Sequence, residues 1–115
     1  KQMTRLTPDI AEPATNRLND GKVGPDGAFW VGSMDDRPEK EKTGALYRIT
    51  PDGDCTRMVD DLIISNGLAW SPDGRFVAFI RRTERTRIAV LTVPALGVAA
   101  RRLAAVLRTA LSGPA

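Results

Sequence analysis

The stretch GKVGPDGAFWVGSM, residues 21–34, decides the fold, because its plan returns as GLAWSPDGRFVAFI in residues 67–80. Each copy holds a glycine, a short apolar segment, a Pro-Asp-Gly triplet and then alternating apolar residues. A third triplet, Pro51-Asp52-Gly53, lies between them. Proline presets the φ angle of a turn, aspartate bonds to the turn's own backbone, and glycine accepts a positive φ. The sequence therefore predicts three β-hairpins of the same kind.

Period-two patterning places strands on both sides of each turn. The predicted strands are residues 21–23, 29–34, 45–49, 56–60, 68–70, 76–80 and 88–93. Four of them lie between Gly21 and Asp61, and the triplets at Pro25 and Pro72 begin 47 residues apart. A four-stranded meander that recurs every 40 to 50 residues, roughly, is typical of a β-propeller blade. The predicted fold class is all-β, with two antiparallel blades.

These strands predict blade-like units in residues 17–61 and 66–107, preceded in residues 1–16 by an edge strand and loop of an earlier blade. A closed propeller needs about four or more blades. The chain is therefore predicted to be a fragment, an interpretation favoured over an assembly of several copies. Residues 98–111, VAARRLAAVLRTAL, leave two alternatives open, since their alanines favour a helix while the repeat favours an outer strand.

Composition excludes several classes of protein. With 115 residues, of which 42% are hydrophobic and 27% charged, the chain suits one small soluble domain. It shows no apolar run of the ~18 residues that cross a bilayer and no signal peptide, so we expect a cytoplasmic protein without a membrane partner. Because histidine is absent, Ser-His-Asp and Cys-His sites within the chain are excluded. Cys55, the lone cysteine, is predicted to be a small buried apolar group rather than a nucleophile.

Charge is distributed unevenly along the chain. Residues 1–74 carry 9 Lys and Arg against 13 Asp and Glu, whereas residues 75–115 carry 8 Arg against Glu84 alone. The two net charges are −4 and +7. A basic segment can attract nucleic acid, but no aromatic residue follows Phe79 to stack on bases. Solvated arginines are therefore the favoured interpretation, and we expect no nucleic-acid partner.

A polar cluster comes before the inner strand of each predicted blade. Its members are Asn16, Arg17, Asn19 and Asp20 in the first blade and Ser65 and Asn66 in the second. Two loops at equivalent blade positions would converge on one spot, where loops commonly carry function. Asparagine and aspartate oxygens suit hard cations such as calcium, magnesium or manganese, and arginine supplies a fork for substrate oxygens. On spacing alone, ordinary turns without a ligand are the favoured alternative.

Three blocks occur in order: NRLNDGKVGPDGAFWVGSM in residues 16–34, GALYRITPDG in residues 44–53 and ISNGLAWSPDG in residues 64–74. They closely resemble the senescence-marker protein, regucalcin and gluconolactonase family, whose pattern runs N-R-x-N-D-G-K, then G-x-L-Y, then S-N-G-L-x-W-S. The resemblance implies a six-bladed β-propeller that hydrolyses a sugar lactone. It also implies a divalent cation in the channel, with Ca²⁺ preferred and Zn²⁺ or Mn²⁺ as alternatives.

The same resemblance assigns roles to single residues. Asn66 falls where the family places a metal ligand, and Arg17 where it places a substrate-binding arginine. Asn19 falls where the family places a polar group near both metal and substrate, so it is a candidate for either role. Asp20 is expected to support the loop that holds Asn19.

Departures from the family pattern predict that the isolated chain is inactive. The family takes one carboxylate ligand from a glutamate that lies before the start of this chain, and its general-base aspartate would fall near Ala115. No catalytic residue is therefore assigned. Arg37 stands where some members have a substrate-contacting glutamate, and Asp35 and Asp36 are the nearest replacements for it. Gly24 replaces the usual aspartate.

Three functional hypotheses follow. The leading one is a metal-dependent hydrolase of a sugar lactone. The second is a non-catalytic calcium-binding or regulatory propeller, in which the same loops hold a ligand without turnover. The third is a β-fragment that self-associates through open sheet edges. Trp30 and Trp70 lie in predicted strands, and we expect them to pack between the blades rather than to stack on a ligand.

Overall fold

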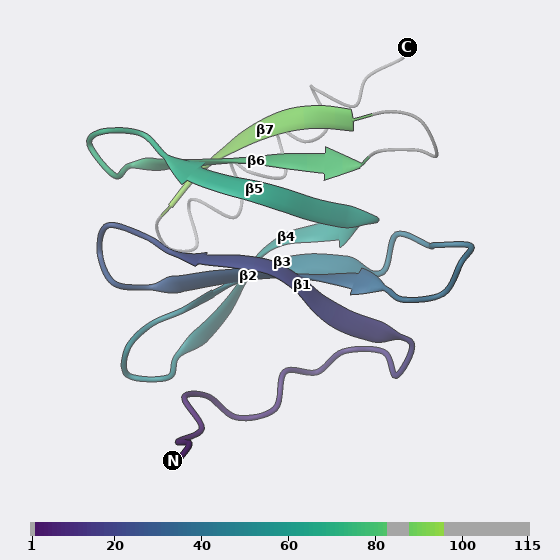
Figure 1. Ribbon diagram of the computed structural model, residues 1–115. Helices are drawn as coiled ribbons and strands as arrows, with labels where there is room; N and C mark the ends of the chain where they lie inside the picture. Colours follow the sequence, from purple (N-terminus) through teal and green to yellow (C-terminus); the bar gives the residue numbers. More distant parts are fainter. Residues whose placement is uncertain (1, 83–87, 96–115) are drawn as a thin grey trace.

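Seven β-strands form the part of the chain that the structure, a computed structural model, describes, namely residues 2–82 and 88–95. Figure 1 shows them as two sheets that lie one above the other. Within the described residues, no helix is long and apolar enough to cross a membrane. Residues 98–111, for which the sequence left helix and strand open, lie outside the described part.

Each sheet is an antiparallel meander in which strands adjacent in sequence pair with each other. The first sheet consists of β1 (Asn16–Val23), β2 (Phe29–Asp35), β3 (Gly44–Ile49) and β4 (Cys55–Leu62). The second consists of β5 (Ile64–Trp70), β6 (Phe76–Arg82) and β7 (Ile88–Pro94). The all-β fold class and the first four-stranded meander are confirmed. The outer part of the second predicted unit, up to residue 107, lies outside the described residues.

All three Pro-Asp-Gly triplets close their hairpins in the same way. The backbone N–H of each glycine donates to the carbonyl three residues earlier, at 2.9 to 3.0 Å. The φ angles of Gly27, Gly53 and Gly74 are 87°, 92° and 73°, in the left-handed region that glycine adopts without steric cost. The predicted turn chemistry is therefore confirmed at each hairpin.

The main core lies between the two sheets. Trp30 from β2 and Phe79 from β6 are among its largest fully buried side chains, and Leu46 and Leu91 pack in the same cluster. The Trp30 and Trp70 rings meet edge to face, with centroids 6.4 Å apart and planes at 72°. The expected packing of these tryptophans between the blades is confirmed, because β2 and β5 belong to different sheets.

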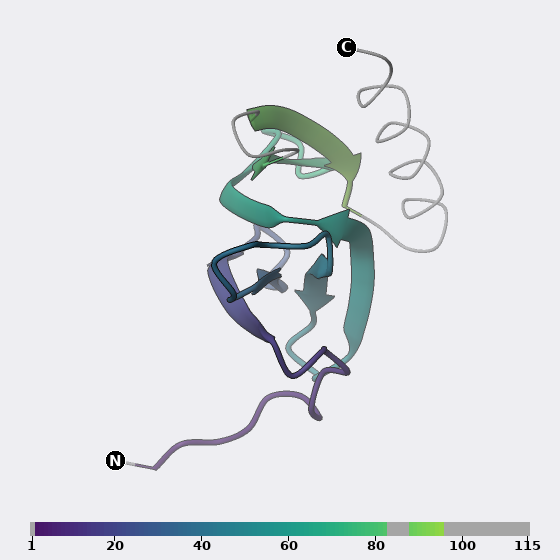
Figure 2. The ribbon, with the colours of Figure 1, turned by 90° about the vertical axis from the view of Figure 1, so that its right-hand side faces the viewer.

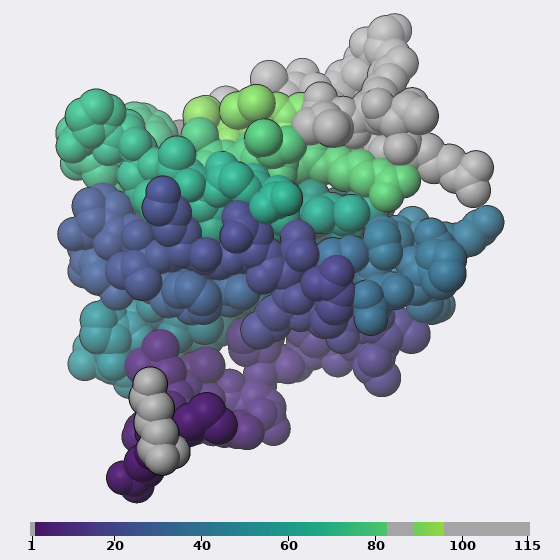
Figure 3. Space-filling model, in the orientation of Figure 1, coloured from purple at the N-terminus to yellow at the C-terminus, as the bar shows by residue number. Residues whose placement is uncertain are grey.

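The outer face of the first sheet is covered by the N-terminal segment rather than by a strand. Residues 2–15 form no strand, and the assignment of residues 1–16 to the edge strand and loop of a preceding blade stays a prediction. Pro8 and Pro13 lack the N–H groups that a strand would donate. Thr7 Oγ1 instead donates to the carbonyl of Gly53 at 2.7 Å, and the segment crosses the far side of the sheet (Figures 2 and 3).

Cys55 differs from its predicted state. We expected a buried apolar group, but Cys55 is the first residue of β4 and is exposed. It lies beside the N-terminal segment, and this partial burial raises the pKa of its thiol. The prediction was wrong because the sheet face on which Cys55 lies is only partly covered.

Candidate polar site between the two sheets

The predicted polar loops are parts of strands. Asn16, Arg17, Asn19 and Asp20 lie in β1, and Ser65 and Asn66 lie in β5, so both strands begin earlier than the sequence predicted. A β-bulge interrupts the pairing of β1 between Leu18 and Gly21, and another interrupts β5 between Asn66 and Ala69. The bulges break the period-two alternation by which strands are recognised in a sequence. This is why the polar residues were predicted to be loops.

The two bulges lie against each other, one from each sheet. Asn19 Nδ2 donates to the backbone carbonyl of Ser65 at 3.1 Å. The backbone N–H of Gly67 donates to Asp20 Oδ2 at 2.9 Å. The structure therefore brings Asn19 and Asp20 next to the segment that carries Asn66. Asn19 and Asp20 are half-buried, whereas Asn66 is exposed.

Ser65 packs tightly beneath this junction. It is buried, and a Cβ atom added to Gly32 in β2 would come within 1.9 Å of its Oγ atom. Gly32 thus leaves room for the Ser65 side chain where β5 approaches β2. Sequence analysis assigned no role to Gly32, and a glycine inside an otherwise apolar strand is the signal that could have indicated a close approach.

Arg17 is held in place by neighbours on both sides. Its Nε atom donates to Asp36 Oδ1 at 2.7 Å. Its Nη1 atom donates to the carbonyl of Leu18 at 3.0 Å and to Asn19 Oδ1 at 3.3 Å. The Arg17 and Asp36 side chains are 49% and 60% exposed, so the pair is open to solvent and to a ligand. Arg17 and Asn19 are thus direct neighbours, as a shared substrate site would require.

Asp35 is not free to replace the family's glutamate. Its side chain is fully buried and forms an ion pair with Arg37, whose Nη2 lies 2.7 Å from Asp35 Oδ2. Asp35 also accepts the backbone N–H groups of Arg37 and Glu41, both at 3.0 Å. The Arg37 guanidinium, helped by these N–H groups, holds the pKa of Asp35 well below its usual range. Asp35 and Arg37 therefore fix the loop after β2, and the buried Asp35 carboxylate is not available to a ligand.

Replacing Asp35 by asparagine is expected to remove a pH dependence of stability. Because folding lowers the pKa of Asp35, its contribution to stability is present above the unfolded value of about 3.9 and is lost as the pH falls below it. The urea midpoint of the parent chain should therefore fall progressively as the pH is lowered below about 4, toward the folded pKa of Asp35. D35N should start from a lower midpoint and change less. The exposed Asp36→Asn is the matched control, and an equal effect of D36N would contradict the prediction.

Gly24, which replaces the family's aspartate, has a packing explanation. A Cβ atom at this position would lie 2.9 Å from the Trp70 indole. A side chain there would displace Trp70, which packs on the main core. The glycine at position 24 therefore makes room for Trp70 between the sheets.

The side-chain oxygens at the junction are of the kind that binds a hard cation, but they are too few to bind it strongly. Within residues 2–82 and 88–95, no group of three or more His, Cys, Asp or Glu side chains could hold a metal ion. The amide oxygens of Asn19 and Asn66 are neutral and already accept bonds, from Arg17 at 3.3 Å and from the Gly67 N–H at 3.0 Å. Affinity for calcium rises with the number of charged ligands. The described residues therefore do not form a strong cation site by themselves.

Comparisons with known proteins place the chain in one family. A profile of the family described as "SMP-30/Gluconolactonase/LRE-like region" matches residues 1–114. Regucalcin of Danio rerio is 39% identical over 82 residues, which is 70% of this chain and 28% of the relative. The 6-deoxy-6-sulfogluconolactonase of Pseudomonas putida is 41% identical over 69 residues, which is 60% of this chain and 23% of the relative. The chain thus spans about a quarter of the length of these curated relatives.

Two solved structures resemble this one. The first is regucalcin of Agrobacterium tumefaciens, described as a calcium-binding protein, with a TM-score of 0.58 and 33% identity. The match covers 76% of this chain and 28% of that one. The second is a luciferin-regenerating enzyme, with a TM-score of 0.62 and 32% identity over 75% of this chain and 28% of that one. Both solved structures are therefore similar to this chain in sequence as well as in fold.

Proposed function

Because the chain belongs to the SMP-30/gluconolactonase/LRE-like family, we propose that the junction of β1 and β5 takes part in the metal-dependent hydrolysis of a sugar lactone. The observation that carries the proposal is the bond from Asn19 Nδ2 to the Ser65 carbonyl, 3.1 Å long, which joins the two polar segments. This contact brings the hairpin that carries Arg17 next to the hairpin that carries Asn66. It supports the assignment of both residues to one site.

In this proposal, one residue binds the substrate and two others bind the metal. Arg17 donates hydrogen bonds to oxygens of the lactone, and Asp36 holds its guanidinium in position. Asn19 and Asn66 supply neutral oxygens to a divalent cation, with Ca²⁺ preferred and Zn²⁺ or Mn²⁺ as alternatives. Asp20 fixes the bulge of β5 through the Gly67 N–H. Further ligands and a general base must come from outside the described residues.

When bound, the cation would polarise the lactone carbonyl and lower the pKa of water near it. The chain's own residues would orient the ring, because Arg17 and Asn19 are adjacent donors on one strand. The name of one relative, 6-deoxy-6-sulfogluconolactonase, supports a sugar-acid lactone as the substrate class.

Calcium titration calorimetry of the 115-residue chain tests the ligand assignment without requiring turnover. We expect weak binding, lost in Asn66→Ala and tightened about tenfold or more in Asn66→Asp, because a charged oxygen replaces a neutral one. Asn16→Asp is the matched control, since the Asn16 side chain bonds to Thr43 and not to the junction. Equal tightening in N16D and N66D would contradict the assignment.

A chimera tests hydrolysis. Residues 16–80 would replace the matching segment of the Pseudomonas putida relative, which supplies the remaining blades. Hydrolysis of the sulfogluconolactone, followed by pH-stat, should require added Ca²⁺, Zn²⁺ or Mn²⁺ and fall about 100-fold or more in N66A. Asn16→Ala should retain most of the activity. Calcium binding without turnover would favour a regulatory propeller instead.

A further inference from the structure

The β-bulge in β1 lets two consecutive side chains reach the second sheet. In a regular strand, neighbouring side chains point to opposite faces. Here Asn19 Nδ2 donates to the carbonyl of Ser65 at 3.1 Å. The next residue, Asp20, accepts the backbone N–H of Gly67 at its Oδ2 atom, with 2.9 Å between nitrogen and oxygen. The bulge therefore places a carboxylate, as well as an amide, against β5.

Asp20 and Asn66 accept a hydrogen bond from the same donor. The Gly67 nitrogen lies 2.9 Å from Asp20 Oδ2 and 3.0 Å from Asn66 Oδ1, so its single hydrogen is shared between the two oxygens. One of these oxygens comes from each sheet. Because both accept the same N–H, a charged oxygen stands beside the neutral one that the proposed function assigns to a cation.

The Asp20 carboxylate carries a charge that no described neighbour neutralises. Within residues 2–82 and 88–95, no Lys or Arg side chain forms an ion pair with it. Its Oδ1 atom accepts no hydrogen bond from these residues. Asp20 is half-buried, and withdrawing a charge from water without a counter-ion costs free energy. A bound cation would offset that cost.

The described arginines near the junction do not serve as this counter-ion. The Arg17 guanidinium bonds to an exposed carboxylate and to Asn19 Oδ1, the latter at 3.3 Å. Arg81 in β6 is buried on the face of the second sheet opposite to that of the exposed Asn66. Because Arg17 brings a positive charge next to the Asn19 oxygen, the structure favours the substrate role for Asn19 and leaves the cation to Asp20 and Asn66.

Building on the proposed function, we propose that Asp20 supplies a charged oxygen to the same cation as Asn66. The chain then has one charged ligand of its own, whereas its asparagines contribute only neutral oxygens. Affinity for Ca²⁺ rises with the charge of its ligands, and a carboxylate beside an amide oxygen suits a hard cation. The hydrogen bond from Gly67 holds the carboxylate in place beside Asn66.

Asp20→Asn separates the charge from the hydrogen bond. An amide oxygen can still accept the Gly67 N–H, so the urea midpoint of D20N should match that of the parent chain. Calorimetric titration of the 115-residue chain with calcium chloride should give a dissociation constant raised about tenfold or more in D20N, because a charged ligand becomes neutral. In NMR spectra of the parent, calcium should shift the amide resonance of Gly67, and the same concentration should shift it less in D20N.

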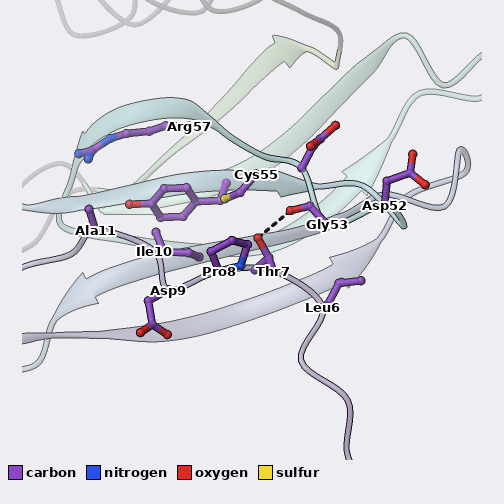
Figure 4. A pocket seen from close by; sticks show the side chains of 12 residues that line it. Leu6, Thr7, Pro8, Asp9, Ile10, Ala11, Asp52, Gly53, Cys55 and Arg57 are labelled. Atoms are coloured by element: carbon purple, nitrogen blue, oxygen red, sulfur yellow. Dashed lines mark hydrogen bonds between the residues drawn. The ribbon is translucent and has the colours of Figure 1, made fainter.

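Asp52→Asn is the matched control, since it removes the same charge away from β5. Asp52 lies in the turn between β3 and β4, beside the N-terminal segment on the outer face of the first sheet (Figure 4). D52N should bind calcium as the parent does. A loss in D52N equal to that in D20N would reduce the effect to net charge and would overturn the proposal.

The remaining outcomes separate this proposal from the proposed function. If D20N bound calcium as tightly as the parent while Asn66→Ala lost it, Asp20 would have only a structural role and the proposed function would stand. If calcium bound to the parent without shifting the Gly67 resonance, the cation would lie away from Asp20, and the proposal would fail whether or not D20N folds. If the parent bound no calcium, both would fail.

Discussion

Replacing Trp30 by alanine is expected to lower the free energy of unfolding by about 3 to 5 kcal/mol, the range for removing a large buried aromatic side chain. Trp30 is 0% exposed and lies in the core between the sheets. Its loss would leave a cavity beside Trp70, whose ring now meets it edge to face. Since small domains are stable by only about 5 to 15 kcal/mol, the variant would lose a large share of its stability.

Urea denaturation followed by far-ultraviolet circular dichroism measures this loss without relying on tryptophan fluorescence. Trp30→Phe is the matched control, because it keeps an aromatic ring in the same place and should cost substantially less. If W30A unfolded at the same urea concentration as the parent, the two sheets would not be packed across Trp30.

Replacing Gly44 by alanine is expected to cost about 3 kcal/mol through overpacking. An added Cβ would lie 2.3 Å from the Ser33 carbonyl oxygen and 2.9 Å from that of Leu62. Both are backbone atoms of paired strands, so neither can move away as a flexible side chain could. Gly44 itself has no positive φ, and the whole effect therefore comes from crowding between β2, β3 and β4.

Gly27→Ala separates this crowding from conformational strain. Gly27 has a φ of 87°, but an added Cβ would meet nothing closer than Pro51 Cγ at 3.8 Å. The cost should be the left-handed strain alone, about 1 to 2 kcal/mol. Urea midpoints of the two variants should therefore rank G44A below G27A, and the reverse order would show that the strands are less tightly packed than the structure indicates.

Much of the fold could be predicted because hairpins are specified locally. The Pro-Asp-Gly triplets and the alternation in residues 29–34 and 76–80 predicted turns and strands that the structure contains. Prediction was less successful where a β-bulge interrupts a strand and where a sheet face is only partly covered by the N-terminal segment. The beginnings of β1 and β5 were predicted as loops, and Cys55 was predicted to be buried.

The candidate site could be predicted only in part. Arg17, Asn19 and Asn66 were chosen from the repeat and the family pattern, and the structure places their segments next to one another. Nothing in the sequence indicated that Asp36 forms an ion pair with Arg17 or that Arg37 forms one with Asp35. Both pairings depend on how the loop after β2 folds back, which the pattern of residue types does not specify.

The sequence by itself determined the turns, the strand-rich character and the family of this protein, because each depends on residues within a few positions of one another or on motifs in fixed order. Only the tertiary structure decided that two polar segments 46 residues apart meet at facing bulges. That contact arises from the packing of one sheet on the other, with Gly32 admitting Ser65 and Trp30 meeting Trp70. Such packing depends on shape across the core, which no local stretch encodes.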